Sequence, residues 1–353
     1  MPGSSAPLSL LPEDQETLAR APDRMFDGLR DSHLLVTGGT GFVGTWLLTS
    51  LAWANRELNL GARATVVSRD PSSFIKREPW ARSQEWLDFI VGDVRDFAPP
   101  QTRFTHVILG AATADARLAA EEPLMLMDTI LRGASQTFRA AVGARSVLVL
   151  SSGAVYGLGG EKMNKIPEDF EGHLDRLDPM LAYHEAKRAL ETMGSAAAAE
   201  CGFDVKIARL FAFVGPWLPG NRHFAVGNFI QDGLAGRSIV VRGDGSPERS
   251  YLYAADMAVW ILSILVEGPN ARAYNVGSDR AISMATLADL VSREFPAGPG
   301  VNVLGGRGTG GGGQRYVPSV DRAAKELGLR QTVTLEDGIG RTVRWLRKQS
   351  GRR

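Results

Sequence analysis

The fold is decided by residues 34–44, which read Leu-Leu-Val-Thr-Gly-Gly-Thr-Gly-Phe-Val-Gly. An apolar run leads into a turn with a glycine at every third position, and a helix-like stretch follows at 43–54. Glycine allows the positive φ of a tight turn and the close approach of a pyrophosphate, which the free N–H groups of the next helix can bind. The stretch therefore predicts the first strand, turn and helix of a dinucleotide-binding domain. We place five of its residues at the cofactor: Gly38, Gly41, Phe42, Val43 and Gly44.

Outward from this stretch, strand-like runs alternate with helix-like segments as far as residue 210. This alternation is typical of a parallel sheet covered by helices on both faces. Aromatic residues, glycines and prolines replace it after Phe211. We therefore predict an α/β fold, a Rossmann-type doubly wound parallel sheet with a smaller C-terminal substrate-binding lobe. The expected parts are a loosely held N-terminal extension at 1–30, an NAD(P)-binding Rossmann domain at 31–210, a mainly substrate-binding lobe at 211–340 and a basic C-terminal tail at 341–353.

Composition excludes several classes of protein. With 353 residues, 44% hydrophobic and 22% charged, the chain can bury a globular core. Its net charge of +1 provides no field for gripping nucleic acid, and no apolar run approaches the roughly 18 residues of a membrane span. The single cysteine, Cys201, and the lack of a signal-like start indicate the cytoplasm. Five histidines at no ligand spacing indicate no metal site.

The end of the second predicted strand bears on the choice of cofactor. An acidic residue there would bind the adenine ribose of NAD, but Ser68 is followed by Arg69. Arginine can pair with the extra phosphate of NADP, or it can simply stack on adenine, so we expect NADP or NAD with NADP favoured. Asp93 and Val94 follow the third strand near the adenine, although an Asx turn explains Asp93 equally well. Ala111, after the fourth strand, completes the predicted cofactor site.

Tyr183 and Lys187 stand four residues apart in a strongly helical stretch, which places them on one helix face. An ammonium near a phenol lowers the pKa of the tyrosine and makes it a usable acid or base. Ser152 ends a predicted strand, at the sheet edge where α/β proteins bind ligands. On their own, Tyr183 and Lys187 could simply lie on a solvent-exposed helix face without a function. Together with the serine and the glycine turn, they predict a site for a carbinol or ketone oxygen.

From about residue 33 to 329, the chain resembles the extended short-chain dehydrogenases/reductases of the nucleotide-sugar epimerase/dehydratase/reductase group. The residues that carry this resemblance are 37–44, 92–93, 151–157, Tyr183, Lys187, Arg209, 215–216, 243–245, Arg249, Asp256, 274–277, Arg315, Asp321 and 327–328. The resemblance implies that Tyr183 is the acid/base and that Lys187 is its electrostatic partner and a ligand of the nicotinamide ribose. Ser152 would donate a hydrogen bond to the reacting oxygen.

The resemblance also implies the partners of the protein. Arg249 and Arg315 match arginines that hold a nucleotide diphosphate, and His223 and Asn228 lie in the segment that lines the nucleotide pocket. The expected substrate is therefore a nucleoside-diphosphate sugar. A homodimer is expected through the helices at 124–141 and 181–200, although their apolar residues could equally face the core.

Two departures from the family pattern narrow the chemistry. Family dehydratases carry Asp and Glu directly after the active-site hydroxyl residue, but here Gly153 and Ala154 occupy these places and neither moves a proton. Ile130 replaces an Asn that serves a water-linked proton relay, unless Asp128 or Thr129 substitutes for it. We therefore expect a 4-keto reductase or a 4-epimerase, with a 4,6-dehydratase disfavoured. The alternative is a catalytically silent member that senses cofactor or binds a partner.

Overall fold

The computed structural model describes eight stretches of the chain, namely 7–111, 120–157, 159–160, 163–173, 177–220, 224–298, 300–305 and 314–351. The chain forms two compact units, and each contains several segments. Unit 1 consists of Met1–Val155, Leu174–Arg209 and Ala258–Tyr274, and unit 2 of Tyr156–His173, Leu210–Met257 and Asn275–Arg353. The chain thus returns to unit 1 after residue 257, which differs from the expected continuous lobe at 211–340.

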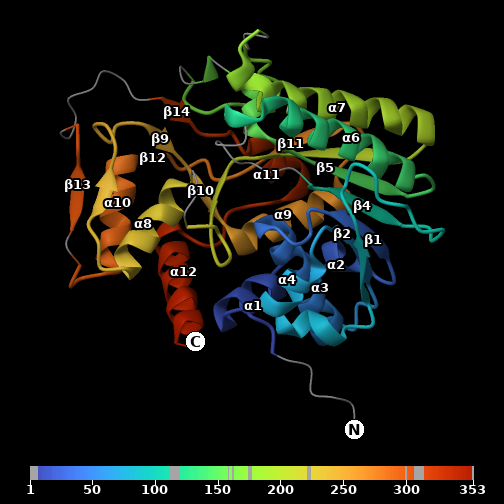
Figure 1. Cartoon of the computed structure of the whole chain (residues 1–353), viewed down its shortest axis with the longest axis horizontal. Helices are drawn as coiled ribbons and strands as arrows, with labels where there is room; N and C mark the ends of the chain where they lie inside the picture. The colour runs from blue at the N-terminus through green and yellow to red at the C-terminus, as the bar shows by residue number, and fades with distance from the viewer. Residues whose placement is uncertain are drawn as a thin grey trace. The chain divides into compact units, whose positions relative to one another are not determined.

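Unit 1 contains a seven-stranded sheet in the order β11-β6-β5-β4-β1-β2-β3 (Figure 1). Its strands are β1 (His33–Thr37), β2 (Arg63–Ser68), β3 (Leu87–Val91), β4 (His106–Leu109), β5 (Ser146–Ser152), β6 (Asp204–Leu210) and β11 (Arg272–Val276). Strand β1 pairs in parallel with both β2 and β4, so the strand order reverses there. Ligands of such sheets bind at the carboxyl ends of the strands beside this reversal. The predicted Rossmann-type fold is confirmed.

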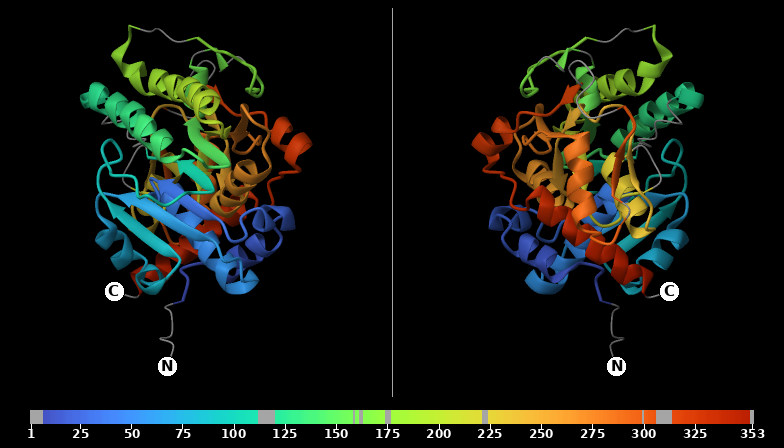
Figure 2. Two further views of the ribbon diagram at one scale, coloured as in Figure 1. Left: turned by 90° about the vertical axis from the view of Figure 1, so that its right-hand side faces the viewer. Right: turned by 90° about the vertical axis from the view of Figure 1, so that its left-hand side faces the viewer.

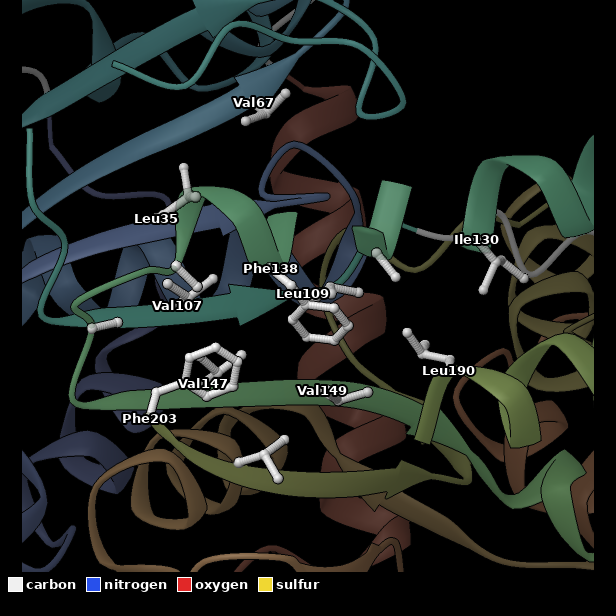
Figure 3. Close-up of a cluster of buried hydrophobic side chains, with 14 of the residues drawn as sticks. Leu35, Val67, Val107, Leu109, Ile130, Phe138, Val147, Val149, Leu190 and Phe203 are labelled. Atoms are coloured by element: carbon white, nitrogen blue, oxygen red, sulfur yellow. The ribbon is translucent and has the colours of Figure 1, made fainter. Parts of the chain in front are cut away.

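Helices cover both faces of this sheet (Figures 1 and 2). On one face lie α6 (Pro123–Ala140) and α7 (Ala182–Cys201), and on the other lie α3 (Phe42–Leu58), α4 (Pro71–Arg77) and α9 (Ala254–Glu267). Figure 3 shows the core beneath α6 and α7, where Val147 and Val149 of β5 meet Phe138 of α6 and Leu190 of α7. Residues two apart in a strand point to the same face, and burying each such side chain contributes roughly 1.5–3 kcal/mol.

Residues 12–27 form two packed helices, which corrects the expectation of a loosely held extension over 1–30. Helices α1 (Pro12–Ala19) and α2 (Asp23–Asp27) bury Leu18 and Met25 completely. Pro12 begins α1, and proline is favoured at a first helical position because its missing N–H would have no partner there. Pro12 and Pro22 therefore mark the starts of α1 and α2, not a linker.

Unit 2 contains short strands and four helices among its described residues. The strands form three small sheets, namely β10 (Tyr251–Tyr253) with β7 (Ala212–Val214), β13 (Val301–Val303) with β8 (Ile239–Val241), and β12 (Ile282–Ser283), β9 (Glu248–Arg249) and β14 (Arg315–Tyr316) in that order. The helices are α8 (Ala225–Leu234), α10 (Met284–Arg293), α11 (Asp321–Leu327) and α12 (Leu335–Ser350). Helix α12 buries Val343 and Trp345, so most of the expected basic tail is a packed helix. Within the described ranges, no helix is long and apolar enough to cross a membrane.

Candidate active site

The glycine turn follows β1, and it packs against residues 110–111, which follow β4. Gly38 has a φ of +74°, and a Cβ there would lie 2.5 Å from the carbonyl oxygen of Gly110. A Cβ at Gly44 would lie 2.3 Å from the Cα of Gly39. The hydroxyl oxygen Oγ1 of Thr37 accepts hydrogen bonds from the N–H groups of Gly110 and Ala111 at 3.1 and 3.2 Å. Backbone geometry and packing therefore require glycine at positions 38 and 44.

Gly41 has no such requirement within the protein. Its φ is −82°, and a Cβ there would meet no described atom closer than the Gly38 carbonyl oxygen at 3.4 Å. Gly41 immediately precedes α3, whose first N–H groups receive no side-chain cap. A ligand that approaches this backbone closely explains the glycine, because a side chain would occupy the space. The turn, with Phe42 and Val43 opening α3, thus fits the pyrophosphate of a dinucleotide.

The predicted adenine side differs in part from expectation. Arg69 is exposed, whereas the carboxylate of Asp93 is bound by Arg95, with Nε–Oδ1 and Nη2–Oδ2 distances of 2.9 and 3.1 Å. The N–H of Arg95 also donates to Asp93 Oδ1 at 3.0 Å, which is the Asx turn. Hydrogen bonds from Arg95 lower the pKa of Asp93, and the charge of Arg69 adds to this effect. The Asp93 carboxylate is therefore engaged by its own chain.

The structure brings Ser152, Tyr183 and Lys187 together. Ser152 is the last residue of β5, and its hydroxyl lies close enough to the phenol of Tyr183 to lower the pKa of that phenol. Its oxygen also accepts the N–H of Ala154 at 3.1 Å. The Nζ atom of Lys187 lies 5.8 Å from the centre of the Tyr183 ring. The sheet edge and one face of α7 therefore position all three side chains at one place.

The protonation states differ from the sequence-based expectation. Lys187 is only 3% exposed and donates from Nζ to the carbonyl oxygen of Leu150 at 2.8 Å. Burial lowers the pKa of Lys187 to about 8, against an opposing effect of Glu191. Burial also raises the pKa of Tyr183, and the nearby hydroxyl of Ser152 only partly offsets this. The expected lowering of the tyrosine pKa is therefore wrong for the protein alone, because loss of hydration outweighs it, and the phenol is protonated at neutral pH.

The candidate substitutes for the missing relay residue are engaged elsewhere. Ile130 is buried in the core beneath α6. Asp128 accepts a hydrogen bond from Arg95 Nη1 at 3.1 Å, and the hydroxyl of Thr129 donates to the Met125 carbonyl at 2.8 Å. Neither side chain supports the relay in this arrangement. No cluster of side chains suited to a metal ion occurs in the described ranges.

In unit 2, the two predicted phosphate-binding arginines lie on neighbouring strands. Arg249 of β9 pairs with Tyr316 of β14, and Arg315 of β14 pairs with Glu248 of β9. The guanidinium of Arg315 contacts the Glu248 carboxylate, whereas Nη1 of Arg249 donates to the carbonyls of Glu248 and Gln314 at 2.9 Å. Both arginines are thus held in place by their own chain. Asn228 lies on α8, and His223 lies outside the described residues.

Glu191 is a residue of this region that the sequence pattern does not single out. It follows Lys187 by four residues on α7, and its carboxylate binds Ser151 and Arg209. The spacing from Tyr183 through Lys187 to Glu191 is the signal that could have identified it, because residues four apart share a helix face.

The sheet, the glycine turn and the Ser152–Tyr183–Lys187 cluster define a Rossmann-type dinucleotide-binding protein with a polar site at the carboxyl edge of its sheet. A model of the NAD dependent epimerase/dehydratase family matches residues 34–277, and the chain belongs to this family of extended short-chain dehydrogenases/reductases. The residues of the glycine turn and of the polar cluster all fall within that match.

Relatives and solved structures agree with this assignment. UDP-glucuronic acid decarboxylase 1 of Xenopus tropicalis is 28% identical over 319 residues, which cover 90% of this chain and 72% of that protein. UDP-glucuronate 4-epimerase 4 of Arabidopsis thaliana is 26% identical over 337 residues, with 88% and 74% covered. The structure of UDP-glucose 4-epimerase from Thermotoga maritima with UDP-glucose superposes with a TM-score of 0.75 at 22% identity, covering 90% of this chain and 99% of that one. The dTDP-glucose 4,6-dehydratase of Streptomyces venezuelae with NAD and TYD bound gives a TM-score of 0.75 at 23% identity, covering 90% and 98%.

Proposed function

We propose that the protein is an NAD(P)-dependent oxidoreductase or isomerase that acts on C4 of a nucleoside-diphosphate sugar, as a 4-keto reductase or a 4-epimerase. The observation that carries this proposal is that the end of β5 and one face of α7 bring Ser152, Tyr183 and buried Lys187 together. The cluster lies at the carboxyl edge of the sheet that also carries the glycine turn, where ligands of this fold bind. Relatives named for UDP sugars support the substrate class.

In the reductive direction, Tyr183 donates its phenolic proton to the oxygen of the 4-keto group. A nicotinamide cofactor, when bound, supplies the hydride that the carbonyl carbon receives. Ser152 lies beside Tyr183 at the end of β5, so its hydroxyl can turn from the phenol to the oxygen of a bound sugar and orient it. The ammonium of Lys187 stabilises the phenolate left on Tyr183 until water returns the proton.

The protonated state of Tyr183 in the protein without cofactor suits the first step of a reductase. Burial raises the pKa of the phenol, so at neutral pH it is ready to give a proton. An epimerase begins with the opposite step, in which the phenolate takes the proton of a sugar hydroxyl before the hydride leaves. That step requires the positive charge of Lys187 to lower the pKa of Tyr183 once substrate and cofactor have excluded water.

NADP is the favoured cofactor. Arg69 is exposed directly after β2, where the adenine ribose binds in this fold. The nearest acidic residue, Asp70, is the N-cap of α4, and its Oδ1 accepts the N–H of Ser73 at 2.9 Å. Asp70 is therefore used by the helix, whereas Arg69 can pair with a 2′-phosphate.

Decarboxylation is a second candidate, because several relatives that cover 87–92% of this chain are named UDP-glucuronic acid decarboxylases. Oxidation at C4 of a uronic acid places a ketone β to the carboxylate, and β-keto acids lose carbon dioxide without an added acid. The same three side chains therefore suffice. A 4,6-dehydratase is disfavoured, because Gly153 and Ala154 offer no carboxylate. The intact cluster also argues against a catalytically silent member.

One experiment separates these reactions. The protein is incubated with reduced or oxidised cofactor and with a 4-keto nucleotide sugar, UDP-glucose or UDP-glucuronate, and the products are identified by NMR and mass spectrometry. Net oxidation of reduced cofactor identifies a reductase, inversion at C4 without net oxidation identifies an epimerase, and carbon dioxide release identifies a decarboxylase. Cofactor binding without turnover of any sugar would overturn the proposal in favour of the silent member.

We also propose that the protein is a homodimer through α6 and α7. Leu126 and Ile130 of α6 face the core, whereas Leu124 is 81% exposed and Met125 is 39% exposed. These two side chains are available to a second copy. Light scattering of Leu124→Glu beside the wild type tests this, and a wild-type monomer would contradict it.

A further inference from the structure

Three consecutive residues of β5 each lie beside one residue of α7. The Ser152 hydroxyl is close enough to Tyr183 to lower its pKa, and the Leu150 carbonyl accepts from Nζ of Lys187 at 2.8 Å. Between them, the hydroxyl of Ser151 donates to Oε1 of Glu191 at 2.6 Å. The three α7 residues follow one another at intervals of four, so they lie along one face of the helix. Glu191 is thus the third member of the row that begins with the proposed acid.

Glu191 is also fixed from the neighbouring strand. Arg209 of β6 binds it through both carboxylate oxygens, with Nε–Oε1 at 3.0 Å and Nη2–Oε2 at 2.7 Å. The side chains of Arg209 and Glu191 are only 15% and 13% exposed. A carboxylate that accepts three such bonds in a shielded place has a single geometry, because each bond is charge-assisted and the pair is bidentate. The turn of α7 that follows Lys187 is therefore clamped to β5 and β6.

We propose that Glu191 is a positioning residue for the reaction at Tyr183, and that its carboxylate, fixed by Ser151 and Arg209 one helical turn after Lys187, keeps Lys187 in its ammonium form. This inference rests on the proposed function, since it concerns the same cluster. Glu191 raises the pKa of Lys187, whereas burial lowers it to about 8. The other groups around Lys187 are the phenol of Tyr183 and the Leu150 carbonyl, while Asp128 of α6 is bound by Arg95 instead. Without the charge of Glu191, Lys187 would lose its proton closer to neutral pH.

A purely structural role of Glu191 and an electrostatic role predict different effects of substitution. Glu191→Gln keeps the shape and the bond from Ser151 but removes the charge. It also removes the charge of the carboxylate that binds Arg209 in a shielded place, which can impair folding. The double variant Glu191→Gln/Arg209→Gln removes both charges together and avoids this problem. Arg209→Lys is the matched control, because the negative charge of Glu191 remains paired.

The first measurement is an NMR titration of isotopically labelled lysine side chains, with Lys187→Met used to assign the signal. The wild-type midpoint is expected near pH 8, and the single and double Gln variants are expected to titrate about one pH unit lower. Arg209→Lys should match the wild type. An unchanged midpoint in folded Glu191→Gln or in the double variant would overturn the proposal.

The second measurement is the pH profile of turnover. In the wild type, the basic limb should follow the loss of the Lys187 proton, and it should move down by the same interval in the Gln variants. Ser151→Ala, which keeps the charge, should leave the basic limb in place. If the wild type turns over no nucleotide sugar, the proposed function fails, whereas the lysine titration still decides the role of Glu191.

Discussion

Strand β5 has a buried lysine near each of its ends, and the two lysines differ in how their own chain satisfies them. Near its first residue, Lys206 donates to Ser146 Oγ at 2.9 Å and to the carboxylate of Asp204 at 3.3 Å. Near its last residue, Lys187 donates only to the Leu150 carbonyl among the described residues. Both side chains are 3% exposed. An ammonium has three protons to donate, so Lys187 retains capacity for a ligand. Lys206 therefore stabilises the structure at the amino end of β5, whereas we propose that the equally buried Lys187 takes part in the reaction at the carboxyl end.

Removal of the phenolic hydroxyl should produce the largest effect at the carboxyl end. Tyr183→Phe is expected to lower kcat about 1,000-fold, because general acid catalysis contributes roughly 100- to 10,000-fold. The free energy of unfolding should change by no more than about 1 kcal/mol, the net value of one hydrogen bond. Steady-state kinetics and thermal unfolding measure both, with Tyr253→Phe as a control. Full turnover in Tyr183→Phe would exclude this phenol as the proton donor.

The two lysines provide the next test, because they are matched in burial. Lys187→Met should lower kcat at least about 100-fold, since the phenolate of Tyr183 then lacks its positive partner. Lys206→Met should leave kcat within about twofold, because its partners at the amino end of β5 are protein groups. Turnover at saturating cofactor and sugar is the measurement. Similar losses in both variants would show that burial alone, not the place on the sheet, decides their importance.

Acid should lower the free energy of unfolding, because it protonates a buried histidine at the amino end of β4. His106, at the start of β4, is 1% exposed, and burial next to Arg145 and Lys206 lowers its pKa to about 4. Its Nε2 accepts from Arg145 at 3.0 Å, which requires the neutral ring. The unfolded chain binds this proton near pH 6.5, so the free energy of unfolding should fall by up to about 3 kcal/mol between pH 6.5 and 4.

Urea unfolding across this pH range measures the effect of His106. His106→Gln should show a flatter pH dependence, since it lacks the group that the unfolded chain protonates. His33→Gln is the control, because His33 is only partly buried, and although burial and Arg63 lower its pKa, Asp88 raises it. An identical slope in wild type and His106→Gln would place the acid sensitivity elsewhere.

The fold could be predicted from the sequence where the requirement is local. Gly38 has a positive φ, and Gly44 packs against the backbone of Gly39 in the same turn, so the glycine spacing reveals both. The strands of unit 1 as far as β6 follow from apolar runs for the same reason. Strand β11 could not be predicted this way, because the chain reaches it only after passing through unit 2, and no local pattern encodes that return.

For the site, too, the sequence predicts the features that depend on local spacing but not those that depend on tertiary packing. The four-residue spacing of Tyr183 and Lys187 is a helix property, and the structure places both beside Ser152. The direction of the Tyr183 pKa shift depends on how completely neighbouring elements exclude water, which composition and spacing do not contain. The Glu191–Arg209 pair joins α7 to β6 and depends equally on tertiary packing.

Substitution of Arg69 should have the smallest effect, and it tests whether the carboxyl end of β2 also binds the cofactor. Because Arg69 is exposed beyond β2, Arg69→Ala should leave the free energy of unfolding unchanged and weaken NADP binding by about 10- to 100-fold, or about 1.4–2.8 kcal/mol. NAD binding should change less than about threefold, since NAD lacks the 2′-phosphate. Calorimetric titration with both cofactors measures this, and Lys76→Ala on nearby α4 is the charge-matched control. Equal losses for NAD and NADP would assign Arg69 to stacking on adenine, whereas a loss confined to NADP would extend the functional character of the carboxyl edge from β5 to β2.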